Sequence, residues 1–249
     1  MKVLLTIQYK GTNYVGWQKQ HNGTSVQETI ENALSFLCEE NVKISGSGRT
    51  DAGVHALGQT AHFETSSQKF LTNKKLDSKK LVNALNANLP SDINISSAKE
   101  VGENFHARFD AKQKTYEYHL VVGKNPIKEG LAGFVKNFPN ISLMKEASKF
   151  LIGEHNFKSF SSAKTEVTDF VRTIYSIKIY MQEKNEIVFE ISGNGFLYNM
   201  VRIIVGTLVD VGIGKILPED IKEILNSEDR TKAGKTAPAE GLYLKAVKY

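Results

Sequence analysis

A single carboxylate, Asp51, stands in a glycine-rich stretch beside an arginine, and these residue types can do chemistry. The stretch runs from Gly46 to Ala56 with the sequence GSGRTDAGVHA, and Arg49 lies two residues before Asp51. Glycines let the backbone turn sharply and let a bulky partner approach closely. A nearby arginine favours the ionised carboxylate, which is the form that a nucleophile or a base needs. We therefore take Asp51 as the candidate catalytic residue.

Two non-catalytic interpretations of this stretch compete with the first. An aspartate in a turn commonly accepts a hydrogen bond from its own backbone two residues on, which needs no chemistry at all. A dinucleotide-binding loop is excluded, because Asp51 stands where that fingerprint requires its third glycine. Gly234-Lys235-Thr236 resembles the end of a Walker loop, but the glycine required five residues before Gly234 is missing. The residues alone leave a structural turn and a catalytic carboxylate both open.

The elements on either side of the stretch are expected to position Asp51. Lys2 to Tyr9 alternates apolar and polar residues, as a strand does, and Ser25 with Glu28 forms a capping box that opens a helix to about Glu40. Val42 to Ser45 and Gln59 to Glu64 read as strands that enter and leave the glycine turn. A turn between two strands can hold an exposed side chain on a rigid scaffold.

The rest of the chain continues in the same mixed manner. We expect a helix capped by Asp77 or Ser78, a helix capped by Ser142, an apolar helix from Phe196, and an irregular stretch over 123–140. The expected strands of this part of the chain are 93–101, 114–122, 171–181 with 186–192 as a hairpin, and 242–247. On the strand 114–122, Tyr118 reads as a core residue. Two α/β lobes, 1–103 and 104–249, are therefore predicted.

Composition limits the class of protein. With 249 residues, 41% hydrophobic and 24% charged, the chain is typical of globular proteins and long enough for a sizeable core. The apolar stretch from Phe196 to Gly214 is interrupted by Asn199, Arg202 and Asp210, which indicates a buried helix and no membrane span. The single cysteine, Cys38, cannot form an internal disulfide, so a reducing compartment is expected and the cytoplasm is the default.

Charge points weakly towards an anionic partner. The net charge is +5, and only five of the 32 basic residues are arginines, so each arginine is a candidate for a task that needs a planar, bidentate cation. A separate group of lysines has one acid among them and favours a solvated loop, with an RNA backbone as the alternative partner: Lys69, Lys74, Lys75, Lys79 and Lys80.

Several blocks together carry a resemblance to a known family. Gly48 to Gln59, GRTDAGVHALGQ, resembles the active-site signature of the tRNA pseudouridine synthase A family. Tyr9 to Gln20 resembles the amino-terminal block of that family, and four further blocks follow in family order: 86–90, 105–109, 196–206 and 237–242. The resemblance thus covers nearly the whole chain.

The resemblance implies a fold and a reaction. It implies an α+β pseudouridine synthase fold, in which two α/β lobes share a largely antiparallel sheet with a central RNA-binding cleft. It also implies an isomerase that converts uridine to pseudouridine in the anticodon stem-loop of tRNA, at positions 38, 39 and 40, and that acts as a homodimer. No cofactor and no metal is required by this reaction, and His55, His62 and His106 lack the spacing of metal ligands.

The resemblance assigns roles to individual residues. Asp51 matches the catalytic aspartate, which attacks C1′ of the ribose, attacks C6 of the uracil, or removes a ribose proton; these alternatives stay open. Arg202 matches the arginine that pairs with that aspartate, and Arg49 the residue that fills the space left by a flipped nucleotide. Tyr116 matches the tyrosine at the target base and Leu242 the apolar wall of the pocket. His106 and Arg108 are expected at the RNA-facing rim.

One departure and two rival functions remain. The family usually has an acid after the first strand tyrosine, where this chain has Lys10, which puts any contact of that acid in doubt. A nucleoside hydrolase would use the same carboxylate, although glycoside hydrolysis normally takes two carboxylates. A non-catalytic RNA-binding module would need no carboxylate at position 51.

Overall fold

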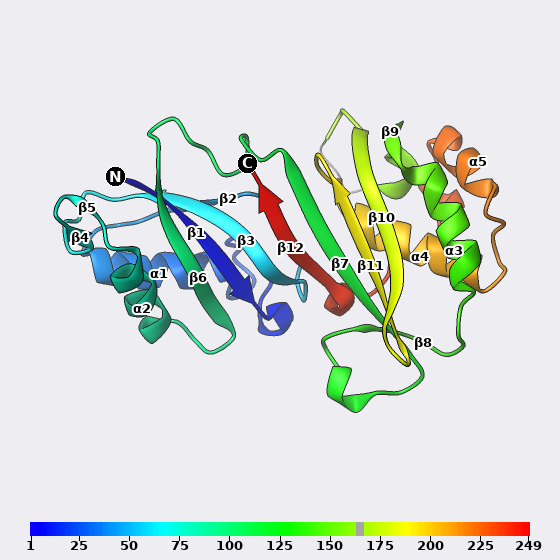
Figure 1. The fold of residues 1–249 in the computed structure, drawn as a ribbon, viewed down its shortest axis with the longest axis horizontal. Coiled ribbons are helices and arrows are strands. Elements are labelled where there is room, and N and C mark those ends of the chain that lie inside the picture. Colours follow the sequence, from blue (N-terminus) through cyan, green and yellow to red (C-terminus); the bar gives the residue numbers. More distant parts are fainter. Residues whose placement is uncertain (163–166) are drawn as a thin grey trace. The chain divides into compact units, whose positions relative to one another are not determined.

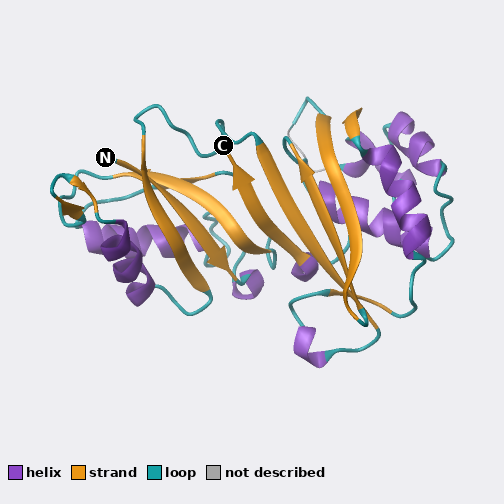
Figure 2. Ribbon diagram, in the orientation of Figure 1, coloured by secondary structure: helices purple, strands orange, loops and turns teal. Residues whose placement is uncertain are grey.

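The chain folds as two compact units, each described here by itself. Unit 1 comprises Met1–Ala111 and Leu244–Tyr249, and unit 2 comprises Lys112–Tyr243. The structure, a computed structural model, describes residues 1–162 and 167–249. Helices and strands occur in both units, as Figure 2 shows. The predicted division into 1–103 and 104–249 stays a prediction.

Unit 1 is built on a sheet in which β1 is central. β1 pairs antiparallel with both β3 and β6, and β2 pairs antiparallel with β3, in the order β6–β1–β3–β12. The predicted alternation of β1 is confirmed, because Val3, Leu5 and Ile7 are fully buried. The strands of this sheet are β1 (Lys2–Tyr9), β2 (Ile44–Gly46), β3 (His55–Glu64), β6 (Ile93–Val101) and, for its last residues, β12 (Leu242–Lys248).

Two capped helices lie against one face of this sheet (Figure 1). The helix α1 (Val26–Cys38) begins at the predicted cap, where Ser25 Oγ accepts a hydrogen bond from the Glu28 amide at 3.1 Å. It ends at Cys38, two residues before the expected end at about Glu40, because Glu39 adopts a left-handed conformation with φ 58°. The helix α2 (Ser78–Asn88) begins at Asp77, whose Oδ1 accepts from the Lys80 amide at 3.0 Å.

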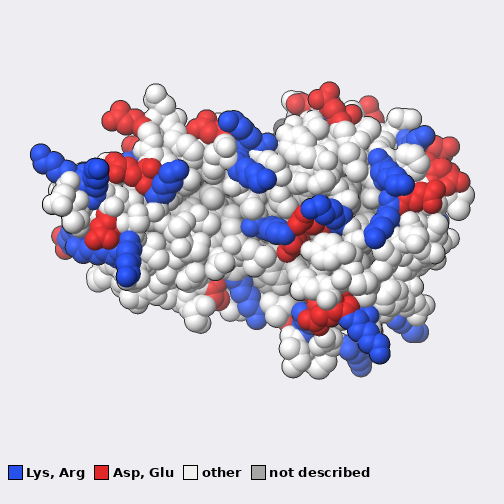
Figure 3. Space-filling view, viewed as in Figure 1, with Lys and Arg blue, Asp and Glu red and all other residues white. Residues whose placement is uncertain are grey.

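The lysine cluster lies around a short hairpin, β4 (Leu71–Thr72) with β5 (Lys75–Leu76). In the view of Figure 3, basic side chains gather at the end of unit 1 that carries these strands, with acidic side chains between them. Lys69 pairs with Glu39, and Lys80 donates to the Lys69 carbonyl at 2.7 Å. Such contacts suit a solvated surface, and an RNA partner for these lysines stays a prediction.

Unit 2 is built on antiparallel strands in the order β7–β11–β10–β9, with the short strand β8 parallel to β7. Its helices lie together on one face in Figure 1. The strands are β7 (Gln113–Val122), β8 (Gly133–Val135), β9 (Gly153–Asn156), β10 (Val171–Glu183) and β11 (Glu186–Gly193), and the helices are α3 (Ile141–Ser148), α4 (Met200–Gly212) and α5 (Asp220–Ser227). Both units together give the predicted α+β class with mostly antiparallel pairing. The RNA-binding cleft stays a prediction.

Three sequence-based expectations in unit 2 were wrong. α3 is capped by Asn140, whose Oδ1 accepts from the amides of Ser142 and Leu143, so Ser142 lies inside the first turn. α4 begins at Met200 and not at Phe196, because Asn199 caps it in a left-handed conformation with φ 61°. The stretch expected to be irregular contains β8, which is too short to leave a periodic signal.

The core of unit 2 contains Tyr118, as predicted. Its side chain is fully buried, and its hydroxyl donates to the Pro238 carbonyl at 3.0 Å. Two glycines make room for the ring, since a Cβ on Gly133 would lie 2.2 Å and a Cβ on Gly241 2.5 Å from its atoms. Gly241 belongs to the block 237–242, so packing against Tyr118 explains that glycine physically.

A buried ionic cluster joins β7 to β11. His119 Nδ1 lies 2.7 Å from Glu186 Oε1, and Nε2 lies 3.6 Å from Glu117 Oε2. Lys128, from the short helix η2 (Pro126–Lys128), pairs with the second oxygen of Glu186 at 2.9 Å, and the Tyr243 ring packs edge-on against His119 at 4.8 Å. Burial disfavours the imidazolium, but hydrogen bonds to Glu117 and Glu186 outweigh it and raise the pKa of His119.

This cluster predicts a pH dependence of stability. A raised pKa stabilises the folded state fully below the ordinary histidine pKa of 6.5 and loses that contribution as the pH rises through the raised value. Wild type should therefore lose more of its free energy of unfolding between about pH 6 and about pH 9 than His119→Gln does. Urea unfolding at the two pH values measures this, with His155→Gln as the control at an exposed hydrogen bond. If wild type and His119→Gln lost equal amounts of unfolding free energy, the cluster would not be the cause of the pH dependence.

Burial would also raise the pKa of Glu186, but hydrogen bonds from Lys128 and His119 outweigh it and lower that pKa. The contribution of Glu186 is consequently present above its ordinary pKa of 4.5 and is lost as the pH falls through the lowered value. The pair of His119 and Glu186 therefore stabilises the fold most between the two ordinary pKa values, 4.5 for the glutamate and 6.5 for the histidine.

Candidate active site

The loop that carries Asp51 is fixed at its base by buried side chains. It joins β2 to β3, whose register pairs Gly46 with Ala61. The Ser47 amide donates to the Thr60 carbonyl at 2.8 Å, and the Ser47 hydroxyl donates to Gln59 Oε1 at 2.6 Å. Gln59 in turn donates from Nε2 to the Gly48 carbonyl at 3.0 Å. A fully buried amide side chain thus sets the course of the loop as it leaves the sheet.

The amino-terminal block holds the residues next to Asp51. The Tyr9 hydroxyl lies 2.7 Å from Thr50 Oγ1, and the Trp17 amide donates to the Thr50 carbonyl at 3.0 Å. On the other side, the Val54 amide donates to the Asp51 carbonyl at 3.1 Å. The backbone of Asp51 therefore lies between two restrained neighbours, which is how a rigid scaffold positions a reactive side chain.

His55 connects the amino-terminal block to the end of the Asp51 loop at which β3 begins. His55, which is 1% exposed, accepts a hydrogen bond at Nδ1 from the Gly11 amide at 3.0 Å. Accepting at Nδ1 requires that this nitrogen carry no proton. The backbone of Gly11 approaches so closely that a Cβ there would lie 2.0 Å from the Val54 carbonyl oxygen. Sequence reasoning considered His55 only as a metal ligand and missed this role.

A second glycine of the block makes a similar approach. Gly16 has φ +109°, and a Cβ there would lie 2.6 Å from the Thr50 carbonyl oxygen. Residues with a side chain rarely adopt this backbone conformation. The glycines of the amino-terminal block are thus explained by contact with the Asp51 loop.

The predicted site residues of unit 1 differ in exposure. Asp51 is half-buried and Arg49 is exposed on the same loop. His106 is half-buried and Arg108 exposed on a separate loop that follows β6. The histidines do not gather with other ligands: in the described ranges, no group of three or more His, Cys, Asp or Glu residues could hold a metal ion.

In unit 2, Arg202 lies in the first turn of α4 and is half-buried. Its Nε donates to the Ala237 carbonyl at 2.7 Å, and its Nη1 donates to Asn199 Oδ1 at 2.8 Å. The predicted partial burial is confirmed. Asn199, to which sequence reasoning gave no role, occupies the N-cap position of α4 without a side-chain capping bond and orients the guanidinium through its Oδ1.

Close backbone packing explains the position of Ala237. The Ala237 amide donates to the Arg202 carbonyl at 3.1 Å, and the Gly234 amide donates to Thr207 Oγ1 at 2.9 Å. A Cβ on Gly206 would lie 1.7 Å from the Lys235 carbonyl oxygen, so only glycine lets this segment lie on α4. The segment 234–237 and the first turns of α4 thus jointly fix the position of Arg202.

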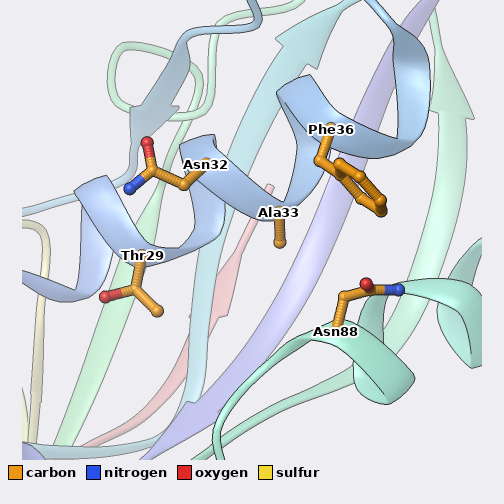
Figure 4. A pocket seen from close by; sticks show the side chains of 5 residues that line it. All are labelled: Thr29, Asn32, Ala33, Phe36 and Asn88. Carbon is orange, nitrogen blue, oxygen red and sulfur yellow. The ribbon is translucent and has the colours of Figure 1, made fainter.

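The other two predicted residues of unit 2 are buried. Tyr116 on β7 is 8% exposed, and its ring meets the Phe196 ring edge-on with centroids 5.2 Å apart. Leu242 is 6% exposed at the first position of β12. A shallow pocket of about 330 Å³ occurs between α1 and α2 in unit 1 (Figure 4), and no predicted site residue lines it.

Comparison with known families decides the assignment. The model of a family described as tRNA pseudouridine synthase matches residues 5–110 and 147–249. This chain belongs to the tRNA pseudouridine synthase family. Curated relatives of this family, each called tRNA pseudouridine synthase A, match along their whole lengths: that of Ruminiclostridium cellulolyticum is 47% identical over 100% of this chain and 99% of the relative, and that of Caldicellulosiruptor bescii is 48% identical over 99% of each. The predicted family is thereby confirmed.

The family match includes most of the predicted site residues. Asp51, Arg49, His106 and Arg108 fall in the first matched range, and Arg202 and Leu242 fall in the second, whereas Tyr116 lies between the two. Among solved structures, an archaeal box H/ACA sRNP Nop10–Cbf5 complex aligns with 83% of this chain at 13% identity and a TM-score of 0.35, a likeness too slight to carry an argument. No helix in the described part of the chain is long and apolar enough to cross a membrane.

Proposed function

We propose that this chain isomerises uridine to pseudouridine in the anticodon stem-loop of tRNA, at positions 38, 39 and 40. The observation that carries the proposal is identity of 45–48% over at least 98% of the length of relatives called tRNA pseudouridine synthase A. The braced loop around Asp51 supports it, because it offers one carboxylate on a rigid scaffold. The resemblance supplies the choice of tRNA positions.

Asp51 is the carboxylate of this proposal. The reaction breaks the bond between ribose C1′ and uracil N1, turns the base over, and joins C5 to C1′, after which the C5 proton leaves to solvent and N1 takes up a proton from solvent. The atoms balance without a cofactor, so an ionised side chain that acts as a nucleophile or a base is sufficient. Attack at C1′, attack at C6 and removal of a ribose proton all use the same group.

The remaining residues have supporting roles in the proposal. Arg49 is exposed on the Asp51 loop, which suits a side chain that fills the space of a flipped nucleotide. Arg202 has its guanidinium oriented by Asn199 and Ala237, as a permanently charged partner of a catalytic carboxylate requires. Tyr116 offers an aromatic face to the target base, and Leu242 an apolar wall.

Tritium release tests the reaction and its position together. A tRNA transcript labelled at C5 of uridine should release tritium when incubated with the protein. Replacing uridines 38, 39 and 40 with cytidine should reduce that release to background, while replacement of uridines elsewhere should not. Continued release from the triply replaced transcript would refute the proposed positions, and no release from any tRNA would refute the activity.

A homodimer in the cytoplasm completes the proposal. The resemblance implies the dimer, and the lone, buried Cys38 suits a reducing compartment. Sedimentation equilibrium should give twice the mass of the chain; a monomer at micromolar concentration would contradict this part.

A further inference from the structure

A line of aromatic rings in unit 1 runs from the last residue of the chain to the surface. The centroid of Tyr249 lies 4.9 Å from Phe105, and Phe105 lies 6.2 Å from His62. His62 lies 4.8 Å from His106, and His106 lies 4.3 Å from Phe109. His62, in the middle of the line, is buried, whereas Tyr249 is 36% exposed and Phe109 is 75% exposed. The line therefore ends on a ring that faces solvent.

Hydrogen bonds hold the loop that carries Phe109. Ala107, which is fully buried, donates from its amide to His62 Nδ1 at 3.1 Å and accepts at its carbonyl from the Tyr249 hydroxyl at 3.0 Å. The His106 amide donates to Asp110 Oδ2 at 2.8 Å. Burial is the larger cause and the nearby His106 the smaller cause of a lowered pKa of His62. The His62 ring therefore stays neutral and can accept the hydrogen bond from Ala107. An aromatic ring on a braced loop loses little conformational freedom when it binds a partner.

Exposure alone would not single out Phe109, because isolated apolar side chains are common on protein surfaces. Phe36 on α1 is 73% exposed and serves as a comparison. The Phe109 and His106 rings are tilted by 31° to each other, and the Arg108 guanidinium lies over the Phe109 ring, 5.8 Å from its centroid. Within the described residues Phe36 has neither a ring contact nor a cation of this kind; it lines the shallow pocket with Thr29, Asn32, Ala33 and Asn88 (Figure 4).

An exposed aromatic ring with a guanidinium over it matches the chemistry of an unpaired nucleotide. Bases stack on aromatic side chains, and a guanidinium can stack on the ring or bind the adjoining phosphate. Bases within a duplex have their faces covered by their neighbours, so the partner is an unstacked base.

The partner base differs from the uridine that reacts at Asp51. His62 supports the platform from a position seven residues after His55 on β3, and extended strands rise about 3.3 Å per residue. Asp51 is hydrogen-bonded to Val54, immediately before β3 begins. The two places are consequently separated by on the order of 20 Å along the strand, which is several nucleotides of RNA.

We propose that Phe109, packed against His106 and with the Arg108 guanidinium over its ring, forms together with that guanidinium a stacking platform for an unpaired base of the RNA substrate distant from the reacting uridine. This inference rests on the proposed function. It assigns to Phe109 a binding role in which the aromatic face, and not merely apolar area, provides the contact.

Equilibrium binding of unmodified tRNA transcript tests the platform. Phe109→Ala should raise the dissociation constant by roughly five- to hundredfold, Phe109→Trp should restore it to within about threefold of wild type, and Phe109→Leu should stay weak. Phe36→Ala is the matched control and should bind as wild type does. At saturating tRNA, Phe109→Ala should keep the wild-type kcat, because the ring does not touch the reacting atoms. Thermal unfolding shows whether each variant is folded.

The outcomes distinguish this inference from the proposed function. Wild-type affinity in Phe109→Ala, full rescue by Phe109→Leu, or equal weakening in Phe36→Ala would each overturn the platform while leaving wild-type turnover intact. Binding by wild type without turnover would refute the proposed function, and the loss in Phe109→Ala would still show the platform. Failure of wild type to bind tRNA would overturn both.

Discussion

Asp51→Asn is expected to lower the rate of tritium release from tRNA by at least about a thousandfold, the scale on which loss of a catalytic nucleophile or base is felt. The amide has nearly the same shape as the carboxylate but can neither form an ester-like adduct nor accept a proton at neutral pH. The loop should keep its course, because the contacts that fix it come from Ser47, Thr50 and Val54 and not from this side chain alone. Single-turnover kinetics with labelled transcript measure the effect.

Asp92→Asn is the matched control for this substitution. Asp92 Oδ1 accepts from the Tyr14 hydroxyl at 2.6 Å and Oδ2 accepts from Asn13 Nδ2 at 3.2 Å; an asparagine can accept the first bond and loses only the second, which is exposed. Its rate should stay within about threefold of wild type, a small barrier change of well under 1 kcal/mol. The affinity of Asp51→Asn for tRNA should stay within severalfold of wild type. A slow Asp51→Asn that also binds tRNA poorly or unfolds at a lower temperature would point to structural damage and contradict a purely chemical role.

Gly11→Ala is expected to reduce both stability and turnover, although Gly11 carries no reactive group. Its new Cβ would lie 2.0 Å from the Val54 carbonyl oxygen and 2.8 Å from the carbonyl carbon, both backbone atoms that cannot rotate away. The loop must move instead, and a displacement near 1 Å costs about a hundredfold in rate. Overpacking of this kind typically costs about 1–3 kcal/mol of unfolding free energy. Urea unfolding and kcat at saturating tRNA give the two numbers.

Gly102→Ala provides the control for the added methyl group. A Cβ on Gly102, also in unit 1, would meet nothing within 4 Å. Both its stability and its kcat should match those of wild type. If Gly11→Ala kept full kcat while losing stability, the contact of the amino-terminal block with the Asp51 loop would be structural only.

Local sequence signals predicted a large part of the fold. Alternation placed β1, and the capping box of Ser25 and Glu28 placed the start of α1, because each depends on residues within one turn or one strand. The glycine loop between two strands was also predicted from its own residues, although β3 begins at His55, four residues before the expected Gln59. Tyr118 was recognised as core from its place on the strand.

Contacts between distant residues could not be predicted in this way. The contact that explains Gly11 joins it to residues 54 and 55, and the ring line joins His62 to His106 and to Tyr249. The start of α4 was misplaced for a related reason: Phe196 continues the apolar pattern but packs against Tyr116 before the helix begins. Apolar periodicity records burial, and burial alone does not distinguish a helix from the turn that precedes it.

A balance of nucleosides tests the central claim most directly. Transcribed tRNA is incubated with the protein and digested completely, and uridine, pseudouridine and free uracil are quantified by chromatography. Isomerisation at Asp51 predicts that each uridine lost appears as one pseudouridine and that no free uracil is formed. When Asp51→Asn replaces wild type, the uridine content should stay constant and no pseudouridine should appear. Free uracil with abasic sites, or pseudouridine formed at the wild-type rate by Asp51→Asn, would contradict it.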